Sequence, residues 1–281
     1  MAFAEHAASG HGVRANRVPS CREPRGVART GSRHGMGGAG PDPVPGTRLG
    51  PMSTSRVCAA YSERADEYIE ACGSMGDVHP EDLALVRRFA KLAGGRIVDA
   101  GCGPGHWTDF LQEHGSEVEG VDLSPAFIDR ARQRFPLVPF RVGNLEALGM
   151  RDGSVAGILS WYSIIHTQPR DVGTILREFA RCVTAGGLVL LGFFDGPAVQ
   201  AFEHQVVTAY RWPVQRLCGE LEAAGFAILE VHTRADPGHR PHGAILARKP
   251  GPGSRGTDRP AVCGRPADPA PAPWARTISA A

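Results

Sequence analysis

The residues best suited to bind a ligand form a glycine-rich segment after a short apolar run. The segment reads Asp99-Ala100-Gly101-Cys102-Gly103-Pro104-Gly105, and Arg96-Ile97-Val98 precedes it. Glycine lets the chain turn sharply and brings bare backbone against a ligand, where a Cβ would obstruct the approach. In α/β proteins, ligands bind outside the carboxyl ends of the parallel strands. The segment therefore predicts a ligand site at a strand-to-helix turn.

The spacing of the glycines separates two kinds of nucleotide cofactor. The dinucleotide fingerprint is G-x-G-x-x-G, and its third glycine would fall at position 106, which is His106. The register here is G-x-G-x-G. Asp122 ends the next apolar segment, seventeen residues beyond Gly105, where a carboxylate can accept hydrogen bonds from two ribose hydroxyls. That carboxylate suits either cofactor, so a nicotinamide-dependent (NAD) oxidoreductase stays open, although the glycine register disfavours it.

Alternating strands and helices must position this turn. Apolar patterning predicts strands at 96–100, 117–122, 138–142, 155–161, 187–194, 226–233 and 242–248. It predicts helices at 55–70, 80–93, 105–114, 124–134, 169–182 and 213–224, and Ser124 followed by Pro125 is typical of a helix start. Strands separated by helices of this length predict an α/β fold with a parallel sheet covered on both faces.

Taken in order, these motifs resemble those of class I S-adenosylmethionine-dependent methyltransferases of the small-molecule type, from about Tyr61 to Lys249. The resemblance implies a Rossmann-like fold with a seven-stranded, mostly parallel sheet and helices on both faces, and S-adenosyl-L-methionine as cofactor. It places adenine beside Asn144, which replaces the commoner Asp; an amide still hydrogen-bonds an exocyclic amine. The residues that the resemblance assigns to the cofactor are Tyr61, Asp99, Gly101, Cys102, Gly103, Gly105, Asp122, Leu123, Asn144, Leu145 and Ser160.

The end of the fourth predicted strand bears on the methyl acceptor. Family members that methylate planar amide or adenine nitrogens carry Asp/Asn-Pro-Pro-Tyr there, whereas this chain has Ser160-Trp161-Tyr162-Ser163. Methylation of a nucleobase or of a glutamine nitrogen is therefore disfavoured, and a different small-molecule acceptor is expected. His166, a few residues past the strand, is the candidate general base, although an isolated histidine there is more often a hydrogen-bonded structural group. The segment 194–212 is either a cover over an apolar acceptor pocket or a strand hairpin packed on the sheet.

Structural roles remain open for several of these residues. Asp99 can satisfy backbone amides of the tight turn, and Asp122 can cap the helix that follows it. Cys102 has no histidine partner in the pattern, so it is interpreted as structural. Methyl transfer from a sulfonium depends mainly on positioning, and few catalytic residues are expected. A methyltransferase-fold protein that binds ligands without catalysis therefore also remains open.

Composition separates both ends of the chain from the middle. Residues 1–51 contain ten glycines, six prolines and one aromatic residue, and residues 249–281 contain seven prolines, so both are predicted to be disordered beside a domain at 52–248. The two ends carry net charges of +4 and +3, whereas the middle carries −5. Because the basic excess lies outside the predicted domain, the domain is not expected to bind nucleic acid.

Cysteine usage and hydropathy set the expected location. The seven cysteines are scattered and never spaced Cys-x-x-Cys, which predicts neither a disulfide framework nor a metal site. The first 20 residues contain no apolar run long enough for a signal peptide, and no uncharged apolar stretch of the sequence is long enough to span a bilayer. A cytoplasmic location without a membrane partner is therefore expected, and the sequence carries no signal for oligomeric state.

Overall fold

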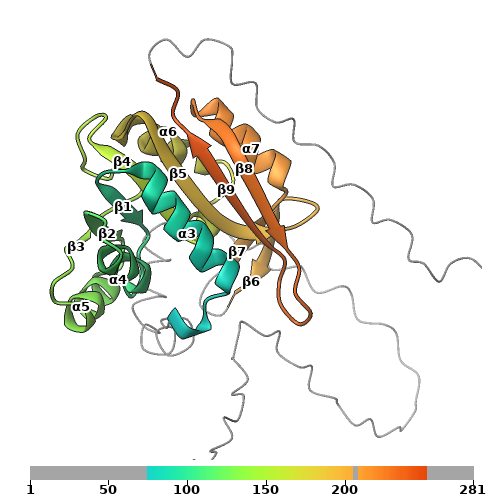
Figure 1. Cartoon of the computed structure of the whole chain (residues 1–281). Helices are drawn as coiled ribbons and strands as arrows, with labels where there is room; N and C mark the ends of the chain where they lie inside the picture. The colour runs from blue at the N-terminus through green and yellow to red at the C-terminus, as the bar shows by residue number, and fades with distance from the viewer. Residues whose placement is uncertain (1–74, 205–207, 252–281) are drawn as a thin grey trace, which may run out of the picture.

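A computed structural model describes residues 75–204 and 208–251, and these residues build one β-sheet with helices on both faces (Figure 1). The strands are β1 (Ile97–Ala100), β2 (Val118–Asp122), β3 (Phe140–Val142), β4 (Val155–Trp161), β5 (Val183–Asp195), β6 (Gln200–Glu203), β7 (Thr208–Trp212), β8 (Ala227–Arg234) and β9 (His242–Arg248). The helices are α3 (Pro80–Ala93), α4 (His106–Glu113), α5 (Pro125–Arg134), α6 (Val172–Cys182) and α7 (Val214–Ala223), with 3-10 helices η1 (Met75–Asp77) and η2 (Ile164–His166). The helix expected at 55–70 lies outside the described residues.

The central strands are parallel and buried. β1 lies between β2 and β4, and all four of its residues are buried. β3 flanks β2 and β5 flanks β4, which gives the parallel order β3-β2-β1-β4-β5. Beyond β5, β9 pairs antiparallel with β5 and β8 pairs antiparallel with β9. The seven expected strands are thus neighbours in one mostly parallel sheet, which confirms the Rossmann-like α/β fold.

The sheet has nine strands rather than the expected seven. β6 and β7 form an antiparallel hairpin within the segment 194–212, and β7 pairs with the last two residues of β5. Because β9 occupies the other edge of β5 as far as Phe194, β7 must lie on the edge that β4 occupies, beyond Trp161 at the end of β4. Strands this short show too few alternations to be told from a loop in the sequence. The hairpin extends the sheet at the carboxyl end of β4.

Local capping explains where two of the helices begin. Ser124 Oγ accepts a hydrogen bond from Phe127 N at 3.4 Å, and Pro125 occupies the first turn of α5, as predicted. His79 Nδ1 accepts one from Glu81 N at 3.2 Å at the start of α3. In contrast, α4 begins directly after the glycine-rich turn and has no side-chain cap. The turn between β1 and α4 is therefore built from backbone.

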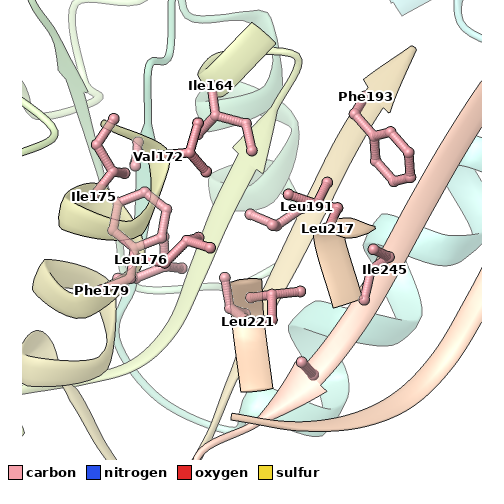
Figure 2. Packing of buried hydrophobic residues seen from close by; sticks show 14 of the residues in the cluster. Ile164, Val172, Ile175, Leu176, Phe179, Leu191, Phe193, Leu217, Leu221 and Ile245 are labelled. Carbon is pink, nitrogen blue, oxygen red and sulfur yellow. The ribbon is translucent and has the colours of Figure 1, made fainter. Parts of the chain in front are cut away.

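Two large hydrophobic layers, with a smaller cluster that includes α5, hold the helices against the sheet. Figure 2 shows one of them, in which α6 and α7 pack on β5 and β9 through Ile175, Leu176, Phe179, Leu217, Leu221, Leu191, Phe193 and Ile245. The layer that contains α3 and α4 includes Val86, Phe89, Leu111, Ile97, Leu190 and Leu246. Adjacent residues of one strand, such as Leu190 and Leu191, enter opposite layers because side chains alternate along a strand.

The last described residues remain attached to the sheet. Lys249 N donates to Gly187 O at 2.9 Å, and the Lys249 ammonium donates to the carbonyls of Ala180 and Val183 at 2.6 and 2.8 Å. Lys249 therefore joins the end of α6 to the end of β9, one residue past the predicted domain end. The division of the chain at 52–248 stays a prediction.

Candidate cofactor and acceptor site

The glycine-rich turn lies at the carboxyl end of β1, in the middle of the sheet. Gly101 N and Cys102 N both donate to the carbonyl of Val121 in β2, at 2.7 and 3.1 Å. Gly101, Gly103 and Gly105 have φ angles of 83°, 51° and 86°. Residues with a Cβ rarely adopt such angles, so the backbone of this turn requires its glycines.

The surroundings of the three glycines differ. A Cβ at Gly101 would lie 2.1 Å from Ser163 Cβ, and one at Gly105 would lie 2.7 Å from Phe140 Cζ. Neighbouring side chains therefore close these two positions. Among the described residues, no atom lies within 4 Å of the position that a Cβ would take at Gly103. The turn thus leaves open space beside bare backbone at Gly103, which fits a cofactor that approaches the main chain there.

Asp122 joins the turn to the end of β2. Its Oδ2 accepts from Gly103 N at 2.9 Å and its Oδ1 accepts from Ser124 N at 2.8 Å. Each carboxylate oxygen has a second acceptor position, which suits ribose hydroxyls. Burial raises the pKa of this carboxyl, and the backbone donors of Ser124 and Gly103 oppose that rise. Asp122 therefore holds the turn and keeps acceptor capacity toward a ligand.

Asp99 is buried beneath the turn. Thr108 Oγ1, on α4, donates to Asp99 Oδ2 at 2.7 Å, and the side chain of Asp99 is only 1% exposed. Burial raises the pKa of Asp99 to about 7; the Thr108 hydrogen bond lowers it, and the charge of Asp122 raises it further. A carboxyl that titrates near neutrality changes charge readily when a cationic group binds beside it.

Other predicted cofactor residues lie around the same edge. Cys102 is buried, and burial raises the pKa of its thiol well above the usual range, which fits a structural role. Asn144 follows β3, and its Oδ1 accepts from Glu146 N at 3.0 Å. Leu123 is half-buried after β2, and Leu145 packs against the layer of α6 and α7. Tyr61 lies outside the described residues.

Two serines connect the end of β4 to the turn. Ser160 is fully buried and its Oγ lies 2.5 Å from Ser163 Oγ, in a shared hydrogen bond. Ser163 is also the residue that a Cβ at Gly101 would strike. Ser160 therefore holds Ser163 in place against Gly101 of the turn.

Tyr162 directly follows β4 and has an unusual backbone. Its φ of 55° is the one positive φ at a non-glycine residue within the described part of the chain. Its hydroxyl shares a hydrogen bond with Nδ1 of His242 at the start of β9, and its ring lies 4.9 Å from the ring of Phe194 between centroids. Strained backbone persists only where the surroundings enforce it, and it is concentrated at functional sites.

A pocket of about 350 Å³ opens beside Tyr162. Three segments line it: the start of α3 from Glu81 to Leu85, the end of β4, and the adjacent ends of β8 and β9. The Arg234 guanidinium donates to both carboxylate oxygens of Asp82 on its wall, at 2.9 and 3.1 Å. A volume of this size accepts a small organic molecule.

His166 lies in η2, a few residues past the carboxyl end of β4. Its Nδ1 is 3.0 Å from the carbonyl oxygen of Thr208, and because a carbonyl only accepts, Nδ1 carries the hydrogen and Nε2 the lone pair. Burial lowers the pKa of His166 to about 4, against the effect of the Thr208 carbonyl, and His204 lowers it further. The imidazole is therefore neutral near pH 7.

Comparison with known proteins identifies the part of the chain that carries this site. A family model described as a methyltransferase domain matches residues 97–187, which include the glycine-rich turn, Asp122 and the end of β4. Residues 97–187 therefore match a methyltransferase domain, in a chain with the Rossmann-like fold of the class I S-adenosylmethionine-dependent methyltransferases. Its cofactor is S-adenosylmethionine, and the alternative of a nicotinamide-dependent oxidoreductase is set aside.

Relatives of the methyltransferase domain have diverse names. The chain is 27% identical over 149 residues to a malonyl-[acyl-carrier protein] O-methyltransferase of Serratia marcescens, covering 53% of this chain and 56% of that protein. It is 39% identical over 106 residues to a magnesium-protoporphyrin O-methyltransferase of Rhodobacter capsulatus, covering 35% and 46%. The chain thus spans about half the length of the curated relatives it matches.

A solved structure shares the fold of the methyltransferase domain. It is the 1,6-didemethyltoxoflavin-N1-methyltransferase of Burkholderia thailandensis, with a TM-score of 0.54 and 20% identity over 71% of this chain and 92% of that chain. At this identity the likeness supports the fold alone.

The methyltransferase domain gathers most of the predicted cofactor residues at one edge. Gly103 of the turn is hydrogen-bonded to Asp122, and Asp99 beneath the turn is hydrogen-bonded to Thr108. Ser160 contacts the turn through Ser163, and Asn144 with Leu145 follows the neighbouring β3. Their contact with the cofactor stays a prediction. The roles of Thr108 and Ser163, and the pairing of Tyr162 with His242, were not predicted from the sequence. The last pair has no local signal, since the two residues are 80 positions apart and meet through the pairing of β9 with β5.

Within 75–204 and 208–251, no three His, Cys, Asp or Glu side chains are grouped so as to hold a metal ion. Over the same residues, every helix is too short or too polar to cross a bilayer.

Proposed function

We propose that this protein transfers the methyl group of S-adenosylmethionine to an oxygen of a small-molecule acceptor that binds beside Tyr162. One observation carries the proposal: the open glycine turn tied to Asp122 lies at the same carboxyl edge of the sheet as the 350 Å³ pocket. The relatives named as O-methyltransferases of malonyl-[acyl-carrier protein] and magnesium-protoporphyrin support oxygen as the accepting atom.

The residues of this chain act mainly by binding and orienting. The bound cofactor supplies a methyl group on a sulfonium, which is already an activated leaving group. Asp122 and the backbone at Gly103 bind the cofactor, while Asp99 beneath them adjusts its charge. Trp161 and Tyr162 shape the wall of the acceptor pocket and exclude water.

His166 is the proposed proton acceptor for an acceptor molecule that arrives protonated. The Thr208 carbonyl fixes the hydrogen on Nδ1, so that Nε2 takes up the proton. Its low pKa makes His166 a weak base, which is sufficient where positioning provides most of the rate acceleration.

Calorimetric titration with S-adenosylhomocysteine and with NAD tests the cofactor. We expect the sulfur ligand to bind the wild-type protein and NAD not to bind; tight NAD binding without binding of the sulfur ligand would overturn the proposal. Methyl transfer is tested by incubating the protein with methyl-labelled cofactor and the small-molecule fraction of a cell extract. Asp122→Ala is the negative control, and absence of any labelled product across extracts would favour a binding protein without catalysis.

A further inference from the structure

Two arginines beside the β6–β7 hairpin lack a counter-ion among the described residues. Arg211 lies in β7 and Arg240 lies in the connection between β8 and β9. Within the described part of the chain, the Nε of each is buried without a hydrogen-bond partner, and neither guanidinium forms an ion pair. Buried N–H donors are almost always satisfied, so these two Nε atoms point to a ligand.

Other arginines of the domain show the contrast. Arg88 pairs with Glu230, Arg181 pairs with Glu178, and Arg234 pairs with Asp82. Each of these guanidinium groups is neutralised by a carboxylate of the domain itself. Arg211 and Arg240 differ from these three arginines because each keeps a buried Nε without a hydrogen-bond partner among the described residues.

Both guanidinium groups lie against the ring of Phe202. Each Cζ is 5.0 Å from the ring centroid, so the two are at most twice that distance apart. In the hairpin register Phe202 is opposite Ala209, which places Arg211, two residues further, on the same face. Arg240 reaches this ring from the β8–β9 connection. Two like charges that share one ring repel each other, and a bound anion relieves the repulsion.

The neighbouring side chains suit an organic anion and adjoin the proposed base. The ring of Phe194 lies edge-on to Phe202 at 5.4 Å, and the ring of His204 lies 6.1 Å from Phe202. His204 in turn lies 5.5 Å from His166. The arginine pair is thus continuous with the acceptor side of the domain through aromatic rings.

We infer that Arg211 and Arg240 bind a carboxylate of the methyl acceptor, which makes the acceptor an organic acid with an apolar or aromatic body. Two planar guanidinium forks match the planar geometry of a carboxylate, and the rings of Phe194 and Phe202 provide apolar contact for the rest of the molecule. The arginines bind and orient the acceptor, and the methyl transfer itself takes no group from them. The inference rests on the proposed function, since it names the substrate class of that site.

The test is a titration of the full chain with benzoate, with its uncharged analogue benzamide and with inorganic phosphate, followed by ligand-detected NMR. We expect benzoate to bind at least tenfold more tightly than benzamide or phosphate. Arg211→Gln and Arg240→Gln should each weaken benzoate at least tenfold. The matched control is Arg216→Gln, which removes an exposed arginine on α7 that pairs with Glu220 at 3.0 Å, and it should leave benzoate affinity unchanged.

In the wild-type protein, equal affinity for benzoate and benzamide, or a preference for phosphate, would overturn the inference. An unaltered benzoate affinity in both glutamine variants would overturn it as well. S-adenosylhomocysteine affinity, measured on every variant, reports folding; where a glutamine variant fails to fold, Arg211→Lys should keep at least part of the preference for benzoate. Because benzoate is titrated without the cofactor, the two proposals fail separately. Loss of cofactor binding by the wild-type protein counts against methyl transfer, whereas an absent carboxylate preference counts only against the arginine pair.

Discussion

Replacing Thr108 by Val tests the electrostatics beneath the glycine-rich turn. The Thr108 hydroxyl is the donor that the Asp99 carboxylate accepts from at 2.7 Å, inside a fully buried site. Valine keeps the shape of threonine, so the cost comes from the lost hydrogen bond rather than from a cavity. The site is tightly packed, since a Cβ at Gly120 would lie 2.9 Å from Thr108 Oγ1. The variant should therefore fold and lose stability.

The size of the loss depends on the charge of Asp99. A hydrogen bond to a charged group stabilises by roughly 1.5–3 kcal/mol and a neutral one by about 0.5–1.5 kcal/mol. Asp99 has a pKa of about 7 in the folded protein, above its usual 3.8, so the folded state keeps a proton that the unfolded chain loses, and stability falls as pH rises through this window. Removing Thr108 raises that pKa further, by about one unit for each ~1.4 kcal/mol.

Equilibrium unfolding in urea at pH 5.5 and at pH 8.5 measures the effect. Thr108→Val should reduce the free energy of unfolding by about 1 kcal/mol at the lower pH and by about 2–3 kcal/mol at the higher pH. Thr108→Ser, which keeps the hydroxyl, should show a smaller loss that does not change with pH. An equal loss at both pH values, or a larger loss at pH 5.5, would refute the assignment of Thr108 as donor to an Asp99 that titrates near neutrality.

Three further predictions use the same site. Asp122→Ala leaves two backbone N–H groups without their acceptor and removes the proposed ribose partner. Calorimetry should therefore show a roughly ten- to hundredfold loss of S-adenosylhomocysteine affinity. Unchanged affinity in a folded variant would contradict the role of Asp122. Gly101→Ala meets Ser163 Cβ at 2.1 Å, whereas Gly103→Ala meets no atom of the described residues within 4 Å. Gly101→Ala should therefore lower the thermal midpoint more, and Gly103→Ala should mainly impair cofactor binding; the reverse order in thermal scans would show that the turn is arranged otherwise. The pKa of His166 is lowered to about 4, so the unfolded chain takes up a proton before the folded protein does as pH falls below about 6.5. The stability of the wild-type protein should therefore decline between pH 6.5 and 4 more steeply than that of His166→Gln. Parallel pH profiles of the urea midpoint would show that His166 is not buried in its neutral form.

The cofactor side of the site could be predicted from the sequence because it depends on local features of the chain. The turn of residues 99–105 needs positive φ at three positions, and only glycine adopts such angles without strain. Asp122 ends the adjacent parallel strand, and the carboxyl ends of parallel strands meet at one edge. Short-range patterning of the same kind predicted the seven main strands, the described helices and the cap at Ser124.

The acceptor side was decided by tertiary structure. The short strands β6 and β7 carry no clear period, and their place beyond the end of β4 follows only from the occupied edges of β5. That placement, with the β8–β9 connection, brings Arg211 and Arg240 to Phe202, and the pairing of β9 with β5 brings His242 to Tyr162. Burial and neighbouring charge, which depend on everything packed around a group, set the pKa values of Asp99 and His166. Sequence determined the residues that a turn or a strand needs locally, whereas contacts between segments far apart in the chain depend on how the strands pair in the folded sheet.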